Sequence, residues 1–108
     1  MIAIKNATLV MRDHLIPEAV LFIEDGIIAG FGEMRNTPIP EGCEIIDAQG
    51  AYVGPGFVDI HVHGGGQKSA MSENPEDIVK MAQAHLKHGT TSIVPTTLAA
   101  PIAQLKDV

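Results

Sequence analysis

The sequence changes its pattern at Gly54-Pro55-Gly56, and no other feature limits the available folds as strongly. Before this point, short apolar runs alternate with turn-forming residues, which is typical of a small β unit. After it, an apolar run, a glycine-rich loop, a helix-like stretch and a second apolar run follow within about 40 residues. That order predicts two parallel strands joined by a right-handed crossover helix. We therefore expect a β part, residues 1–53, and an α/β part, residues 54–108.

The clearest signal in the β part is a hairpin. Asp25-Gly26 separates the apolar runs 19–24 and 27–31, and this dipeptide tolerates the positive φ angles of a type I′ turn. The loop 34–43 contains two prolines and a glycine that would break a helix or end a strand. Further strands are expected at residues 2–4, 8–11, 44–46 and 51–53.

The α/β part begins with a strand over residues 57–63, which carries apolar residues on both faces. Such a pattern is typical of a parallel strand that is covered on both sides. A helix should begin after Asn74 as its N-cap, with Pro75 at its first position, and stop at Gly89. A second strand is expected at 91–96. The helix face that should pack on the sheet comprises Ile78, Met81, Ala82, His85 and Leu86.

Two histidines in the first of these strands are candidate metal ligands. His61 and His63 are two residues apart, so their imidazoles should project from one face, at the carboxyl end where parallel α/β folds place their sites. A divalent metal could bind between them, although a His-x-His pair also occurs on strands that simply face solvent. Asp59 lies one pleat earlier on the same face, and we expect it to orient a ligand imidazole.

Other residues at the same end of the strands are candidates to line a pocket. The backbone of Gly64 and Gly65 could approach an anion, but a glycine run is more often a flexible exit from a strand. Thr96 and Thr97, where the second strand ends, should lie at the same end of the sheet as His61. Threonines in such places are usually structural, so both interpretations stay open.

Three further side chains are expected to carry no chemistry. His85 and His88 lie near the end of a helix of about 14 residues, roughly 20 Å long, which should place them at the opposite end from the histidine pair. His85 is then expected to pack, and His88 to lie favourably beside the helix C-terminus. Cys43 is the only cysteine, so it has no disulfide partner within the chain and is expected to be inert.

Composition excludes several classes of function. The chain has 7 Lys and Arg against 13 Asp and Glu, a net charge of −6, and its cations are scattered singly, so no nucleic-acid surface is expected. No run approaches the roughly 18 apolar residues of a membrane span, and we expect a cytoplasmic protein. With 108 residues the chain is shorter than the about 250 that a complete TIM-type barrel needs, and it is expected to be cut off.

The segment Pro55-Gly56-Phe57-Val58-Asp59-Ile60-His61-Val62-His63-Gly64 resembles the first barrel strand of the amidohydrolase superfamily. Upstream, residues 6–10, 24–26 and 46–50 look like the small β-sandwich that precedes this barrel. Downstream, residues 63–66, Met71 and 88–97 are most similar to the N-acetylglucosamine-6-phosphate deacetylase family. Residues 67–69, Gln-Lys-Ser, depart from the glycine and acidic residues that are commoner there.

The resemblance implies β-sandwich strands followed by the first βαβ unit of an incomplete TIM-type barrel. His61 and His63 would bind a divalent metal, zinc or iron, as part of a site for one or two ions. The family's other ligands and its proton-transferring Asp would lie beyond residue 108. The chain is thus expected to be the N-terminal portion of a hydrolase that deacetylates an amino-sugar phosphate, and to be inactive alone.

Two alternative interpretations stay open. Other amidohydrolases, such as cyclic-amide hydrolases and deaminases, share the His-x-His strand. The chain could instead be a non-catalytic binding module that self-associates, because two parallel strands with apolar faces cannot bury themselves. Whichever interpretation holds, a homo-oligomer is expected.

Overall fold

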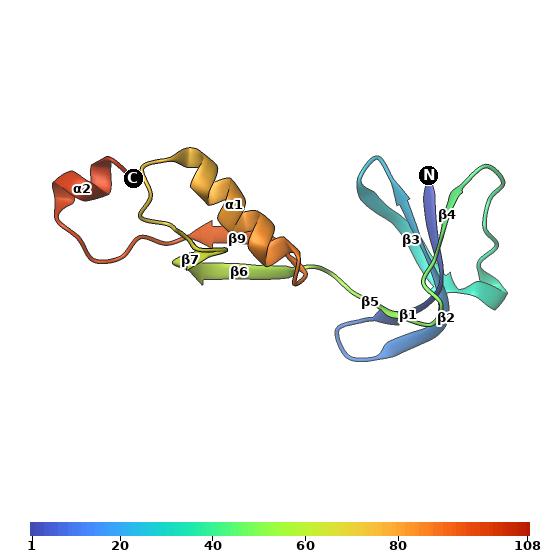
Figure 1. The fold of residues 1–108 in the computed structure, drawn as a ribbon. Helices are drawn as coiled ribbons and strands as arrows, with labels where there is room; N and C mark the ends of the chain where they lie inside the picture. The colour runs from blue at the N-terminus through green and yellow to red at the C-terminus, as the bar shows by residue number, and fades with distance from the viewer. The chain divides into compact units, whose positions relative to one another are not determined.

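A computed structural model describes residues 1–108, and the contacts within it divide the chain into two units, Met1–Pro55 and Gly56–Val108 (Figure 1). The first unit is built from strands and one short 3-10 helix. The second combines strands with two helices.

Five strands of the first unit form one mixed sheet in the order β3-β2-β1-β4, with β5 also paired to β1. β1 pairs antiparallel with β2 but parallel with β4 and β5. All five strands thus belong to one sheet. The elements are β1 (Ile2–Val10), β2 (Leu15–Glu24), β3 (Ile27–Glu33), η1 (Met34–Asn36), β4 (Glu44–Asp47) and β5 (Tyr52–Val53).

The predicted hairpin is confirmed, whereas the first strand differs from its prediction. Asp25 and Gly26 have φ angles of 50° and 77°, and they join β2 to β3 as a type I′ turn does. The strands expected at 2–4 and 8–11 are one strand, β1, with a register shift between Ile4 and Ala7. Asn6 has a φ of 52° at this shift. The bulge bends the strand and interrupts its apolar pattern, which is why the sequence suggests two pieces.

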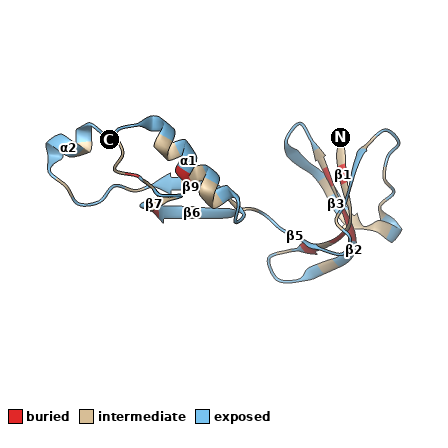
Figure 2. Ribbon diagram, in the orientation of Figure 1, coloured by how far each residue is buried: buried red, intermediate tan, exposed pale blue.

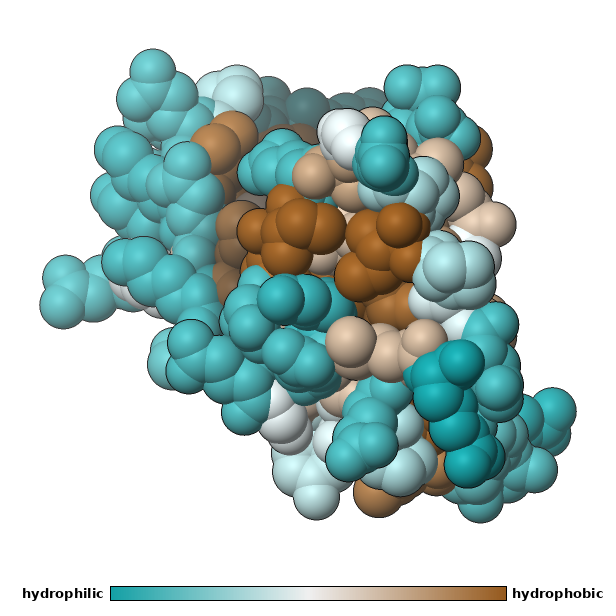
Figure 3. Space-filling view, turned by 90° about the vertical axis from the view of Figure 1, so that its right-hand side faces the viewer, coloured by the Kyte–Doolittle hydropathy of each residue, from teal (hydrophilic) through white to brown (hydrophobic).

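Small apolar residues form the core of the first unit. Ala3, Val20 and Phe22 make one buried cluster, against which Cys43 packs half-buried. Ala7, Leu9 and Ala19 make a second cluster (Figure 2). Apolar side chains also reach the surface of the chain, and on the face shown in Figure 3 they gather between hydrophilic ones.

The second unit contains the expected strand, helix and parallel strand. β6 (Phe57–Val62) pairs in parallel with β9 (Thr90–Pro95), and α1 (Pro75–Leu86) connects them. The side chain of Asn74 accepts a hydrogen bond from the Glu76 amide at 3.1 Å, as its predicted N-cap role requires. A short helix α2 (Ile102–Lys106) follows. Neither helix is long and apolar enough to cross a membrane.

Residues 64–66 do not form the flexible exit that their glycines suggest. Gly64–Gly65 is strand β7, and it pairs antiparallel with β8 (Lys68–Ser69). Gly66 and Gln67 form the turn with φ angles of 57° and 62°, so both adopt the left-handed conformation of a type I′ turn. The glycine run therefore provides a two-residue hairpin directly after the histidine pair.

The core of the second unit is small and leaves most of β6 uncovered. Val62, Ala70 and Met81 are buried together. α1 contacts β7, β8 and β9, and most of β6 is exposed (Figure 2). Val58 and Ile60 on β6 are 67% and 74% exposed. The expectation that this strand is covered on both faces is wrong for this chain. Leu86, expected on the packed face of α1, is also 57% exposed.

Candidate metal centre

The imidazoles of His61 and His63 project together at the carboxyl end of β6, as the two-residue period of a strand predicts. Their Nε2 atoms are 3.1 Å apart, and the rings meet edge to face with centroids 4.8 Å apart. Two nitrogens that each bind one zinc ion at about 2.0–2.1 Å are at most about 4.2 Å apart. The pair therefore fits a single divalent ion.

The backbone carbonyl of Thr96, the residue directly after β9, orients His63. Its Nδ1 lies 2.8 Å from the carbonyl oxygen of Thr96. Since a carbonyl only accepts, Nδ1 must carry the hydrogen, which leaves the Nε2 lone pair directed at His61. Metal-binding histidines commonly donate their second ring N–H in this way. Thr96 thus contributes through its backbone, while its hydroxyl donates to Val94 O at 3.1 Å.

Asp59 does not orient an imidazole, contrary to the expectation from its place on the strand. Its Oδ1 accepts a hydrogen bond from the backbone N–H of His61 at 3.0 Å. The register of β6 and β9 shifts between Asp59 and Val62, which interrupts regular pairing at this amide. The carboxylate therefore replaces a strand partner and supports the backbone that carries His61.

The other residues considered for the pocket are two glycines of a hairpin and one exposed threonine. Gly64 and Gly65 pair with Ser69 and Lys68 in the β7–β8 hairpin. Thr97 is exposed just beyond β9.

His85 is not at the opposite end from the histidine pair, so that prediction is wrong. Its Nε2 lies 2.9 Å from the carbonyl oxygen of Gly64, the residue after His63. The reason is that the β7–β8 hairpin packs along α1 and brings Gly64 to the last turn of the helix. The sequence carries no signal for this contact, because it depends on where the hairpin folds.

An ion pair also joins the hairpin to α1. Lys68 Nζ lies 3.0 Å from Asp77 Oδ1, and Ser72 donates to Asp77 Oδ2 at 2.9 Å. The Lys68 ammonium, with help from the Ser72 hydroxyl, lowers the pKa of Asp77 below its ordinary value. The carboxylate thus remains charged and holds β8 against the first turn of α1.

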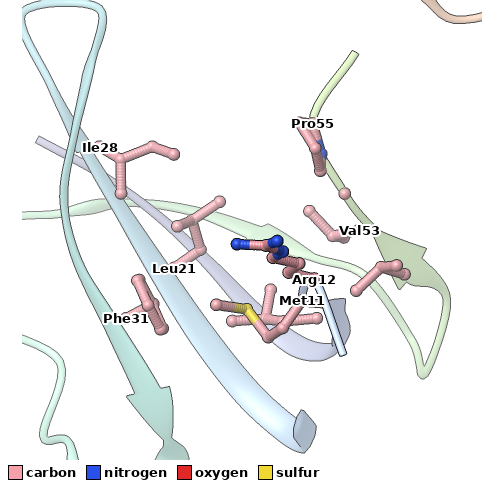
Figure 4. A pocket seen from close by; sticks show the side chains of 10 residues that line it. Met11, Arg12, Leu21, Ile28, Phe31, Val53 and Pro55 are labelled. Atoms are coloured by element: carbon pink, nitrogen blue, oxygen red, sulfur yellow. The ribbon is translucent and has the colours of Figure 1, made fainter. Parts of the chain in front are cut away.

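The pair of histidines is an incomplete ligand set. The chain holds no group of three His, Cys, Asp or Glu side chains that could bind an ion together. Zinc sites in proteins use three or four protein ligands. A cavity of about 300 Å³ lies in the first unit and is lined mainly by apolar side chains, with Arg12 as its one charged residue (Figure 4). Neither histidine lines it.

Sequence comparison finds several proteins that are similar to this chain. No family model matches. The N-acetylglucosamine-6-phosphate deacetylase of Lysinibacillus sphaericus is 28% identical over 95 residues, which are 88% of this chain and 24% of that protein. A dihydroorotase of Geobacillus is 30% identical over 106 residues, 98% of this chain and 24% of that protein. An adenine deaminase of Bacillus licheniformis is 42% identical over 77 residues, 71% of this chain and 11% of that protein.

The crystal structure of N-acetylglucosamine-6-phosphate deacetylase from Pasteurella multocida superposes with a TM-score of 0.88 at 26% identity. It matches 98% of this chain and 28% of that chain. A Mycobacterium smegmatis deacetylase solved in complex with N-acetyl-D-glucosamine-6-phosphate matches with a TM-score of 0.80. The chain spans about a quarter of the length of the deacetylases that it matches.

Proposed function

We propose that this chain, which belongs to the amidohydrolase superfamily, forms the N-terminal portion of a metal-dependent hydrolase that deacetylates an N-acetylated amino-sugar 6-phosphate. The observation that carries the proposal is the 3.1 Å approach of His61 Nε2 and His63 Nε2, with His63 oriented by Thr96. The similarity in fold to N-acetylglucosamine-6-phosphate deacetylases, over nearly the whole chain, supports the substrate class.

His61 and His63 would hold the ion through Nε2. A divalent ion there, zinc or iron, would polarise the amide carbonyl of the substrate and lower the pKa of a bound water. In the ion-free pair His63 Nε2 is an acceptor, so His61 Nε2 donates to it across 3.1 Å. To hold an ion, His61 would need its hydrogen on Nδ1 rather than on Nε2, whereas His63 already has that tautomer.

The remaining ligands and the group that transfers the proton to the leaving amine would come from the rest of the polypeptide. Two imidazoles alone bind an ion openly and weakly. We therefore expect the 108-residue chain to be inactive by itself. Zinc and iron both suit imidazole ligands, and the parent enzyme would hold one or two ions.

Two relatives favour a second candidate within the same superfamily. The dihydroorotase and the adenine deaminase match this chain at 30% and 42% identity. A parent that opens a cyclic amide or releases ammonia would use the same histidine pair.

The test begins with the coding sequence beyond the codon for Val108. An open frame of roughly 250 further residues would supply a barrel. The full product, loaded with zinc, should release acetate from N-acetylglucosamine 6-phosphate, and His61→Ala should abolish this activity while His88→Ala leaves it intact. Ammonia release from adenine, or ring opening of a cyclic amide, without acetate release would replace the deacetylase by the second candidate. A stop codon directly after Val108 would refute both.

A further inference from the structure

Three successive carbonyl groups, from the last residue of β6 to the first of β7, each accept a hydrogen bond from a different segment. Val62 O accepts from Thr96 N at 2.8 Å, and His63 O accepts from Ala70 N at 2.8 Å. Gly64 O accepts from His85 Nε2 at 2.9 Å. The donors follow β9, follow β8 and belong to α1, respectively. Only the third is a side chain, so His85 is the one replaceable group among them.

The approach of His85 depends on the glycine beside it. A Cβ on Gly65 would lie 2.5 Å from His85 Nε2, closer than any real contact. The imidazole therefore reaches the Gly64 carbonyl only because residue 65 has no side chain. Because the carbonyl is an acceptor, His85 Nε2 carries the hydrogen.

The hydrogen bond from His85 constrains more of the backbone than the Gly64 carbonyl alone. Gly64 pairs with Ser69 in the hairpin, and Ala70, the next residue, donates to His63 O. Anchoring Gly64 to α1 thus sets the place of Ala70 and, through it, the peptide that carries the His63 side chain. The ion pair of Lys68 with Asp77 holds the same hairpin near the other end of α1.

We propose that His85 is a positioning residue for the metal-binding pair, acting through Gly64 and the hairpin on the backbone of His63. This inference rests on the proposed role of His61 and His63 as ligands. Removing the Nε2–H donor of His85 should keep both His61 and His63 in the chain but make their imidazoles more mobile. Metal affinity should fall even where the fold is retained, as it does when groups that orient a ligand are removed.

The experiment is a titration of the 108-residue chain with Co²⁺, followed by its visible absorption, for the wild type and three variants. His85→Leu keeps an apolar contact without the donor, and its affinity should fall roughly tenfold. His85→Gln places an amide N–H near the position of Nε2 and should restore most of the affinity. His88→Leu removes an imidazole that lies two residues beyond α1, and its affinity should match the wild type.

The possible outcomes distinguish the ligand role of His61 and His63 from the positioning role of His85. Co²⁺ binding that His61→Ala leaves unchanged would refute the ligand role itself. Binding that needs His61 but is equal in His85→Leu and His88→Leu would refute only the positioning role. If His85→Leu fails to fold, the ring ¹⁵N signals of His85 in the metal-free wild type provide the test, because they show which ring nitrogen carries the hydrogen. Hydrogen on Nε2 agrees with the proposal, and hydrogen on Nδ1 alone contradicts it.

Discussion

His63 Nδ1 lies 2.8 Å from the carbonyl oxygen of Thr96, a residue 33 positions later in the chain. The bond connects the end of β6 with the end of β9. The parallel pairing of these strands is what brings the two ends to one edge of the sheet. A backbone atom thereby sets the tautomer of a candidate metal ligand.

This relationship predicts different effects for two substitutions of Thr96. Thr96→Ala removes only the hydroxyl that donates to Val94 O, so the affinity for Co²⁺ should change less than about twofold. Thr96→Pro removes the N–H that donates to Val62 O and shifts the carbonyl that orients His63, so affinity should fall roughly tenfold or more. Equal affinities in a Co²⁺ titration of the two variants would contradict this assignment.

Met81→Ala should destabilise the second unit strongly. Met81 is fully buried with Val62 and Ala70, and removing its side chain leaves a cavity that costs about 2–5 kcal/mol. Leu86→Ala on the same helix is the matched control, because Leu86 is 57% exposed and its loss should cost about 0.5 kcal/mol or less. Urea denaturation followed by circular dichroism measures both values. Similar losses in the two variants would show that the described core is wrong.

The ion pair of Lys68 with Asp77 predicts a pH dependence of stability. The pKa of Asp77 is lowered in the folded chain, first by Lys68 and then by Ser72. A lowered pKa stabilises the fold above the unfolded-state pKa of about 3.9, and this contribution disappears as the pH falls through the lower folded-state pKa. Asp77→Asn should therefore be less stable than the wild type at pH 7, and the difference should disappear as the pH falls through the lowered pKa of Asp77.

A double-mutant cycle identifies the partner of Asp77. Lys68→Met should lower stability at pH 7 in the same direction, and the double variant should lose less than the sum of the two single losses. Fully additive losses would mean that Lys68 and Asp77 act independently.

The uncovered strand predicts self-association of the 108-residue chain. β6 and β9 form a two-stranded sheet, so each has an unpaired edge, and Ile60 on β6 is 74% exposed. Light scattering should show a mass that rises with concentration. Ile60→Lys should reduce this rise more than Ile102→Lys, which adds the same charge at a site 73% exposed on α2. A monodisperse monomer at every concentration would refute the prediction, whereas a single defined oligomer would favour a self-sufficient module.

Local chemistry in the sequence was sufficient for several elements. Asp25-Gly26 specifies its turn because few residue pairs accept two positive φ angles, and Asn74-Pro75 specifies the start of α1 through a cap and a fixed φ. The common face of His61 and His63 follows from the period of a strand alone. These features depend on residues that are neighbours in the chain.

Only the tertiary structure decided which segments meet. The sequence did not show that β1 pairs with three other strands in one sheet, that Asp59 binds the backbone of His61, or that His85 reaches Gly64. Each of the long-range contacts joins residues far apart in the chain, and the Asp59 contact arises where the pairing of β6 with β9 shifts register. Whether these contacts form depends on the register of strand pairing and on where the β7–β8 hairpin packs. Neither can be deduced from the residue types and spacings of a short segment. The sequence by itself therefore determined most of the elements and the common face of His61 and His63, while the assembled fold determined what holds these two side chains in position.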